Sequence, residues 1–242
     1  MATAKDLIVK PIKSADAIAF VKAHHYSGKV AFGSGVNLGV FFQNRLHGVM
    51  QFGTSVDKRK IQGLVSGTQW HEFLELNRMA FDDVLPRNSE SRALSIAWRL
   101  LKKHAPQVKW VISFADGTQC GDGTIYRASG FLLTNIVTNK NTCKLPSGEV
   151  IHKMTLESNP TSARKELDGK SYYQLTGGKY DFAKYVIEVK GKILIGYQLR
   201  YVLIIDNNCK LNCPILPFSK IDEIGAGMYK GKKITLAERK TS

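Results

Sequence analysis

The chain has few cysteines and few acidic residues for its length, and both shortages restrict its class. Among its 242 residues are 4 cysteines, too few for a small secreted domain built on disulfides. Cys209 and Cys213 have no second pair of metal ligands nearby, so we expect reduced thiols rather than a zinc site. Asp and Glu number 20 against 35 Lys and Arg, which gives a net charge of +15. A surplus of this size is typical of proteins that bind a polyanion, and nucleic acid is the partner that we expect.

Long apolar runs are also missing. No stretch approaches the roughly 18 consecutive apolar residues of a membrane-spanning helix. The first five residues, Met-Ala-Thr-Ala-Lys, contain no apolar signal-peptide core, so we expect no secretory leader. We find no basic amphipathic helix with exposed aromatic residues, which would suit a membrane surface. The sequence therefore predicts a protein of the cytoplasm without a membrane partner.

Two motifs of other DNA-modifying enzymes are absent. The chain has no Pro-Pro pair, so it lacks the Asn/Asp-Pro-Pro-aromatic motif of adenine methyltransferases. No G-x-G-x-x-G motif follows a predicted strand either, which also argues against a methyltransferase. We therefore set a methyltransferase aside.

What the chain does contain is a strand, a polar turn, a helix and a second strand in direct succession. The strands are predicted at 73–82 and 108–115, and apolar residues at helical spacing predict the helix at 93–104. Short connections between them predict a crossover unit with parallel strands. The polar turn brings backbone N–H groups to a helix N-terminus, where an anion is favoured. The side chains expected to bind a ligand at this turn are Arg87, Asn88 and Ser89.

The remaining elements complete a mixed α/β prediction with one central sheet. We expect a helix at 14–24, a hairpin at 36–54 that turns at Asn44 and Arg45, and a loop at 57–69. A short helix at 124–129 and strands at 131–137, 150–156 and 197–205 follow, with a turn region at 138–146. The segment 158–196 is rich in Lys, Tyr and Gly, and we interpret it as an insertion. Its tyrosines either stack on nucleic-acid bases or fill a small core, and the sequence leaves both readings open.

This order of elements resembles the GNAT acyltransferase fold, here with a small C-terminal insertion. The resemblance divides the chain into a catalytic core (1–157), the basic insertion (158–196) and a C-terminal strand with a basic tail (197–242). It implies that the pyrophosphate of coenzyme A meets the turn at 86–92 and that the next strand splays to open a channel. The chain departs from the family pattern at Glu90 and Arg92, where small residues are usual. A carboxylate at position 90 would repel a pyrophosphate. The implied donor is of the acyl or glycyl type, from acetyl-CoA or an aminoacyl-tRNA.

A closer resemblance rests on six short segments in a fixed order and spacing. The six segments are 25–28, 46–53, 76–78, 86–92, 113–116 and 123–126. They look like the Mom DNA-modification proteins of bacteriophages, and residues 197–217 also fit. The resemblance implies a GNAT-like enzyme that adds a carbamoylmethyl group to the exocyclic amine of adenine in DNA. It implies protection of phage DNA from host restriction, a place in the cytoplasm of the host bacterium, and iron as a possible cofactor.

The same resemblance names the candidate site residues. Each has a structural alternative: Arg78 pairs with Glu75 or Asp82, Asp116 caps its turn, Ser91 caps the helix, and Tyr126 packs in the core. We also interpret Arg78 as sharing a strand face with Leu74 and Leu76. The metal candidates are His25 and Asp116. The catalytic candidates are His25, Tyr26, Arg78, Ser91, Asp116 and Tyr126.

An adenine inside a duplex cannot reach a protein pocket, so the resemblance predicts a flipped-out base. The candidate stacking groups are Tyr26, Phe52 and Phe114. Three other functions stay open: a coenzyme A-dependent N-acyltransferase on a small amine or protein, an aminoacyl-tRNA-dependent transferase, and a noncatalytic DNA-binding protein.

Overall fold

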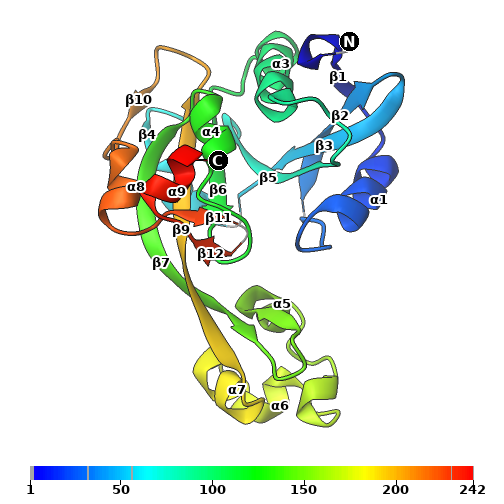
Figure 1. The fold of residues 1–242 in the computed structure, drawn as a ribbon, viewed down its shortest axis with the longest axis vertical. Helices are drawn as coiled ribbons and strands as arrows, with labels where there is room; N and C mark the ends of the chain where they lie inside the picture. Colours follow the sequence, from blue (N-terminus) through cyan, green and yellow to red (C-terminus); the bar gives the residue numbers. More distant parts are fainter. Residues whose placement is uncertain (1–2, 32, 56, 230, 242) are drawn as a thin grey trace. The chain divides into compact units, whose positions relative to one another are not determined.

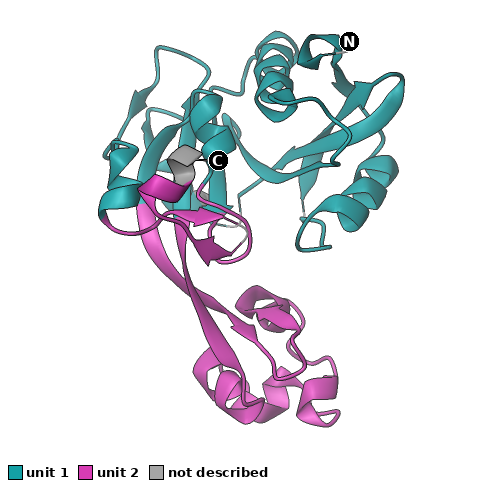
Figure 2. Ribbon diagram, viewed as in Figure 1, with its two compact units in different colours: residues 1–115, 123–135, 199–223 teal, residues 116–122, 136–198, 224–242 magenta. Residues whose placement is uncertain are grey.

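The computed structural model describes residues 3–31, 33–55, 57–229 and 231–241. The chain forms two compact units, shown in Figure 2. Unit 1 comprises residues 1–115, 123–135 and 199–223, and unit 2 comprises residues 116–122, 136–198 and 224–242. Across the described ranges, no helix has both the length and the apolar character needed to cross a membrane.

A mixed sheet runs through unit 1, which confirms the predicted α/β class (Figure 1). Its strands follow the order β1-β2-β3-β5-β6, then the parts of β9 and β7 that belong to unit 1. The first four strands pair antiparallel, and β5 pairs parallel to β6. In unit 2 the strand β8 pairs antiparallel with β7. The strands are β1 (Ile8–Pro11), β2 (Ser34–Phe42), β3 (Arg45–Gly53), β5 (Phe73–Phe81), β6 (Trp110–Asp116), β7 (Leu132–Lys144), β8 (Val150–His152) and β9 (Lys192–Ile204).

Two helices cover opposite faces of the unit 1 sheet. The helix α1 (Ser14–His24) has the predicted bounds and packs its buried Val21 in a cluster with Val49 of β3. The helix α3 (Ser89–His104) places Trp98 against Phe52 of the same strand. Because alternate residues of a strand point to opposite faces, Val49 and Phe52 identify the two sides of the sheet. The face that carries Val49 is the α1 side of the sheet, and the face that carries Phe52 is the α3 side.

The central crossover is confirmed, since β5, α3 and β6 follow one another and the two strands are parallel. Ala93, Leu94, Ala97 and Leu101 of α3 are buried, which is the stripe that the spacing predicts. The helix begins four residues earlier than predicted, at Ser89 instead of position 93. Its N-cap, Asn88, has a left-handed backbone with φ of 69°.

Two local predictions near the hairpin are wrong. The tight turn is formed by Gln43 and Asn44, both with positive φ, one residue earlier than predicted. Positive φ at both central residues is the geometry that matches the twist of a hairpin. The predicted loop at 57–69 contains α2 (Lys58–Gln62) and β4 (Val65–Ser66), which pairs with β10 (Lys210–Leu211). Buried apolar residues of this segment pack around Trp110, so tertiary contacts order it.

The predicted turn at 138–146 is also wrong, because β7 continues through most of it to Lys144. Thr142 and Cys143 are fully buried there, so packing holds a polar sequence in a strand. The strand predicted at 150–156 ends at His152, where α5 (Lys153–Glu157) begins. His152 favours this change because its Nδ1 accepts a hydrogen bond from the Met154 amide at 3.1 Å.

Unit 2 has a small apolar core of its own. Tyr172 and Tyr185 are fully buried in it, so these two tyrosines fill a core, whereas Tyr173 and Tyr180 are 53% and 66% exposed. All of the segment 158–196 lies in unit 2, together with residues 136–157, and the three-part division stays a prediction. Besides α5, unit 2 holds the helices α6 (Tyr172–Thr176), α7 (Phe182–Glu188) and α9 (Leu236–Thr241). Unit 1 also holds α4 (Thr124–Ala128) and α8 (Ser219–Glu223), and β11 (Met228–Tyr229) pairs with β12 (Lys232–Lys233) in unit 2.

Candidate functional site

The sheet of unit 1 opens between β5 and β6. Their parallel pairing joins Phe73–Glu75 to Trp110–Ile112 and then ends, although β5 continues to Phe81. Just beyond the pairing, the buried Ser113 hydroxyl donates a 3.4 Å hydrogen bond to the Leu76 carbonyl. Open α/β sheets bind ligands outside the carboxyl ends of their strands. The expected splayed strands are therefore present, next to Arg78.

A β-bulge in β5 decides where Arg78 points. Gln51 of β3 pairs with Arg78, and the next residue, Phe52, pairs with Leu76, so Asn77 is an extra residue. Gln51 and Phe52 point to opposite faces, and so do their partners. The interpretation that Arg78 shares a face with Leu76 is therefore wrong. The bulge turns the guanidinium to the α1 side of the sheet.

Arg78 is half-buried and bonded to backbone carbonyls. Its Nε donates to the Lys29 carbonyl at 2.9 Å, and its Nη1 donates to the Asn77 carbonyl at 2.6 Å. Among the described side chains, none forms a direct ion pair with Arg78, but its charge interacts with the Glu75 carboxyl, so only the alternative pair with Asp82 is wrong. Asp82 instead contacts Nδ1 of His47 at 2.8 Å. The positive charge of Arg78 thus remains available to a ligand.

His25 lies beside Arg78, at the C-terminal end of α1. Burial, followed by the positive charge of Arg78, lowers the pKa of His25 to about 4. The imidazole is therefore neutral at pH 7. The Ser27 backbone amide donates to Nδ1 at 3.2 Å, and the Ser27 hydroxyl oxygen lies 2.8 Å from the same atom. Because Nδ1 accepts, the ring proton is on Nε2, and His25 offers an N–H donor rather than a base.

Tyr26 follows His25 and is 52% exposed. The centres of the two rings are 4.2 Å apart. The structure thus brings His25, Tyr26 and Arg78 together, as the sequence predicts.

Glu75 also belongs to this site, although the sequence indicated it only as a structural partner of Arg78. Burial raises the pKa of its carboxyl, against the opposing effect of hydrogen bonds with Ser55 and Asn77 and of the Arg78 charge. It pairs with Gly53, two residues after Gln51, so it shares the α1 side with Arg78. A carboxyl with a raised pKa suits proton transfer near neutral pH. The available signal was a carboxylate between the apolar strand residues Leu74 and Leu76.

Two buried amides continue this polar face onto β2 and β3. Gln51 is 1% exposed and Asn37 is 9% exposed. Gln51 Nε2 donates to Asn37 Oδ1 at 2.8 Å. Gln51 Oε1 is buried and accepts no hydrogen bond from any described residue. A buried acceptor in that state costs about 1–3 kcal/mol, which is a large fraction of a typical folding free energy.

Asp116 belongs to unit 2 and orders the turn that follows β6. Its Oδ1 accepts hydrogen bonds from the Thr118 amide at 2.9 Å and from Asn139 Nδ2 at 3.1 Å. This is the structural alternative for Asp116, a carboxylate that caps its own turn. A catalytic role for Asp116 stays a prediction.

The N-terminus of α3 has no side-chain cap. The Ser91 hydroxyl donates to the Asn88 carbonyl at 3.2 Å, so the alternative that Ser91 caps the helix is wrong. Ser89 is fully buried and donates to the Pro86 carbonyl at 2.6 Å, whereas Arg87 and Asn88 are exposed. Of the three residues expected at a donor, two therefore present their side chains to solvent.

Tyr126 lies on α4 and packs in unit 1. Its ring centre is 5.2 Å from those of Phe131 and Tyr201. Gly123, the N-cap of α4, has φ of 83°, and a Cβ there would lie 2.5 Å from Tyr201 Cε2. The glycine of this motif is therefore required for the position of the two tyrosines.

The proposed stacking groups differ in exposure. Phe52 is fully buried against Trp98, so the prediction that Phe52 stacks on a base is wrong. Phe114 is partly buried and packs against the cluster around Trp110. Tyr26 is the exposed member of the set.

The two metal candidates do not assemble into a metal site. Over the described ranges, no group of three His, Cys, Asp or Glu residues is arranged to hold a metal ion. Nδ1 of His25 is engaged by Ser27, and Asp116 Oδ1 is engaged within unit 2. This donor set does not fit a resident iron, and we derive no step through a metal.

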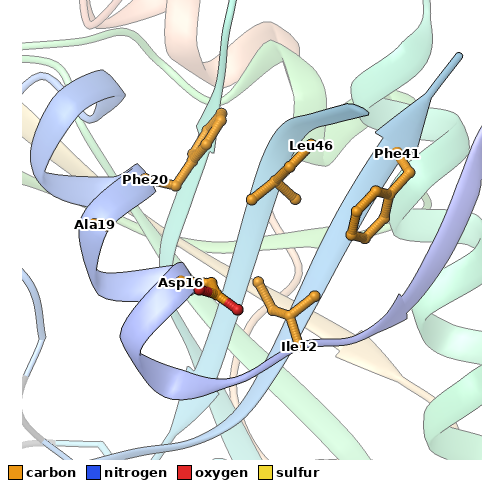
Figure 3. Close-up of a pocket in the computed structure, with 6 residues that line it drawn as sticks. All are labelled: Ile12, Asp16, Ala19, Phe20, Phe41 and Leu46. Atoms are coloured by element: carbon orange, nitrogen blue, oxygen red, sulfur yellow. The ribbon is translucent and has the colours of Figure 1, made fainter. Parts of the chain in front are cut away.

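An apolar cavity lies under the other end of α1 (Figure 3). Its volume is about 390 Å³, and the side chains of Phe20, Leu46, Ile12 and Phe41 point into it from α1 and the neighbouring strands. Asp16 supplies one carboxylate at its wall. None of the candidate site residues lines this cavity.

Comparison with known proteins gives relatives in sequence and in structure. The methylcarbamoylase Mom of Escherichia phage Mu is 37% identical over 155 residues, which are 64% of this chain and 63% of that protein. The match thus spans less than two thirds of the phage Mu protein. The ribosomal-protein-S18-alanine N-acetyltransferase of Escherichia coli has a TM-score of 0.43 and 11% identity over 83% of this chain and 94% of its own. An acetyltransferase of Bacillus subtilis, solved with CoA, has a TM-score of 0.41 and 10% identity over 82% of this chain and 98% of its own.

A family model for Mom proteins matches residues 6–220. This range includes all six of the segments on which the resemblance rests. The chain therefore belongs to the Mom protein family.

Proposed function

We propose that the protein is a transferase that adds a carbamoylmethyl group to the exocyclic amine of adenine in DNA. The observation that carries this proposal is the cluster of Arg78, His25 and Glu75 beside the opening between β5 and β6 in a member of the Mom family. Family membership supports the class of reaction, and the cluster supplies groups that such a reaction needs. The name of the phage Mu relative supports the identity of the transferred group.

The chemistry needs one proton acceptor and at least one donor. The amine nitrogen bonds to the methylene carbon of the carbamoylmethyl group, the bond between that carbon and the rest of the donor breaks, the donor leaves with the bonding electrons, and the nitrogen loses a proton. Because an acetyl group has no nitrogen, the donor must itself supply the carbamoyl nitrogen. Glu75, whose pKa is raised, is our candidate for the group that accepts this proton. Nε2–H of neutral His25 and the guanidinium of Arg78 are then available to orient the carbonyl oxygen of the transferred group.

The donor and the DNA are expected on two different features. The first turn of α3 lacks a side-chain cap and is flanked by exposed Arg87 and Arg92, which suits the anionic part of a donor, whereas Glu90 in the same turn disfavours the pyrophosphate of coenzyme A. The net charge of +15 suits the phosphates on either side of a flipped adenine. Protection from restriction follows if the modified amine blocks recognition of the DNA by host nucleases.

The test is to express the chain in bacteria, digest total DNA to nucleosides and measure their masses. We expect a deoxyadenosine that is heavier by one carbamoylmethyl group. Glu75→Gln and Arg78→Gln should each abolish this product. Tyr126→Phe and Asp116→Asn test the predicted catalytic roles of Tyr126 and Asp116. Arg45→Gln, an exposed change at the start of β3, is the matched control and should keep the product.

Unmodified DNA in cells that contain ample folded protein would refute the proposed function. Binding of acetyl-CoA without any change in the DNA would instead favour an N-acyltransferase on a small amine or protein. Binding of DNA that survives every substitution, again without a product, would favour a noncatalytic DNA-binding protein.

A further inference from the structure

The buried amides of Asn37 and Gln51 lie in one row with Arg78. Asn37 of β2 pairs with Gln51 of β3, and Gln51 pairs with Arg78 of β5. Neighbouring strands are about 4.8 Å apart, and paired residues point to the same face. The three side chains therefore form a continuous polar row on the α1 side of the sheet.

The rows on either side show that this polarity is local. On one side Gly39, Val49 and Ala80 pair with one another and form an apolar surface under α1. On the other side Gly53 pairs with Glu75, the partly buried carboxyl described above. The amide row thus lies between the apolar support of α1 and the groups that we assign to proton transfer.

The hydrogen bond between the two amides fixes the orientation of Gln51. Its Nε2 donates to Asn37 Oδ1 at 2.8 Å, so its Oε1 points away from Asn37. That oxygen is buried and accepts no bond from a described residue. Polar atoms in this state are uncommon in native proteins and require an explanation. A ligand with an N–H group would complete the hydrogen bonding of this row.

We propose that Gln51 Oε1 accepts an N–H of the adenine exocyclic amine, and that Asn37 is the positioning residue that holds the Gln51 amide in this orientation. The inference rests on the proposed function and names the residue that selects the base. Side-chain amides recognise adenine in this way elsewhere, since adenine carries an N–H donor where guanine carries a carbonyl oxygen. A base with a carbonyl at that position would place two acceptors against each other and be rejected.

Gln51 is buried, so a base reaches it only when a neighbouring segment moves. The segment that contains Lys29 is our candidate, because Arg78 Nε donates to the Lys29 carbonyl and Val30 packs on the apolar row under α1. An incoming phosphate or carbonyl that binds the Arg78 guanidinium would break this contact, and the 3.4 Å hydrogen bond from the Ser27 hydroxyl to the same carbonyl would remain.

The test is a binding competition that does not need catalysis. The probes are DNA duplexes with one adenine, or one hypoxanthine, opposite an abasic site, where flipping is easiest. Hypoxanthine presents a carbonyl in place of the amine. We expect the wild-type protein to prefer the adenine duplex about tenfold, the effect of one hydrogen bond to a buried acceptor. Gln51→Met, which is similar in shape and lacks the acceptor, should remove this preference and retain most of the affinity for the phosphate backbone.

Three further variants separate recognition from folding. Asn37→Asp keeps an acceptor for Gln51 Nε2 and should keep the preference, whereas Asn37→Leu should lose it. Thr134→Val removes a buried hydroxyl of β7 that bonds Arg200, and it should leave the preference unchanged. Melting curves of each variant show whether it is folded, and if Gln51→Met is not, Gln51→Leu replaces it.

The outcomes distinguish this inference from the proposed function. If the wild-type protein modifies DNA but Gln51→Met still prefers adenine tenfold, the inference is wrong and the proposed function stands. If the wild-type protein neither modifies DNA nor distinguishes the two duplexes, both are wrong. Loss of the preference in Gln51→Met and Asn37→Leu, with retention in Asn37→Asp, supports the inference.

Discussion

A methyl group at Gly123 should destabilise unit 1 far more than one at Gly130. The two glycines flank α4 and have nearly the same backbone, with φ of 83° and 82°. For any residue with a Cβ, this left-handed conformation costs about 1–2 kcal/mol. The backbone strain of the two alanine variants is therefore equal, and their difference isolates the packing effect.

The packing effect follows from the distances around each glycine. A Cβ on Gly123 would lie 2.5 Å from Cε2 and 2.8 Å from Cζ of Tyr201, and 3.0 Å from Cδ2 of Tyr126. Tyr201 is fully buried, so it has no solvent to move into. Overpacking of this kind costs about 1–3 kcal/mol. The nearest atom to a Cβ on Gly130 is Leu203 Cδ1 at 3.8 Å, an ordinary contact.

We therefore expect Gly130→Ala to lower the free energy of unfolding by about 1–2 kcal/mol and Gly123→Ala by about 2–5 kcal/mol. Urea unfolding followed by tryptophan fluorescence measures both. Adding Tyr201→Leu to Gly123→Ala should recover part of the loss, because the two changes relieve one clash. Equal destabilisation by the two alanines, or strict additivity with Tyr201→Leu, would refute this account of α4.

Two further predictions concern titration and a buried hydrogen bond. The pKa of His25 is about 4 in the folded protein and 6.5 in the unfolded chain, so only the unfolded chain takes up a proton between these pH values. The stability that neutral His25 contributes is therefore present above pH 6.5 and lost as the pH falls toward 4. The fall in pKa corresponds to at most about 3 kcal/mol, which partial exposure of the ring reduces to about 2 kcal/mol. In unfolding measured at pH 7 and pH 4.5, His25→Gln should lose most of this dependence and the exposed His104→Gln should keep it; identical profiles would show that His25 is not the cause. In unit 2, Tyr185→Phe removes the 2.7 Å hydrogen bond from the tyrosine hydroxyl to Glu166 and should lower the free energy of unfolding by about 1–2 kcal/mol, whereas an unchanged urea midpoint would mean that water replaces it.

The sequence predicted the elements whose signals are local. The bounds of α1 and the β5-α3-β6 crossover follow from periodic apolar residues over one or two turns. The position of Tyr126 on a short helix before Gly130 was also recovered, because Gly130 ends that helix with positive φ. Family membership depends on short motifs, which the sequence contains in full.

Segments whose state depends on distant partners were predicted poorly. β7 continues through a polar stretch that looks like a turn, because Thr142 and Cys143 are buried by residues far away in the sequence. The segment 57–69 is ordered by packing around Trp110, which no local pattern of its own encodes. In both cases a tertiary environment overrides a local preference.

For the candidate site, the sequence alone determined the charge, the motifs, the place of His25 after a helix and the place of Arg78 within a strand. Only the tertiary structure decided which way Arg78 points, since one extra residue at Asn77 reverses the face of the strand. The same register places Gln51 and Glu75 beside Arg78, with Gln51 buried and Glu75 partly buried. Register is set by pairing between strands that are far apart in the chain, and a slip of one residue exchanges the two faces, so local sequence cannot encode it.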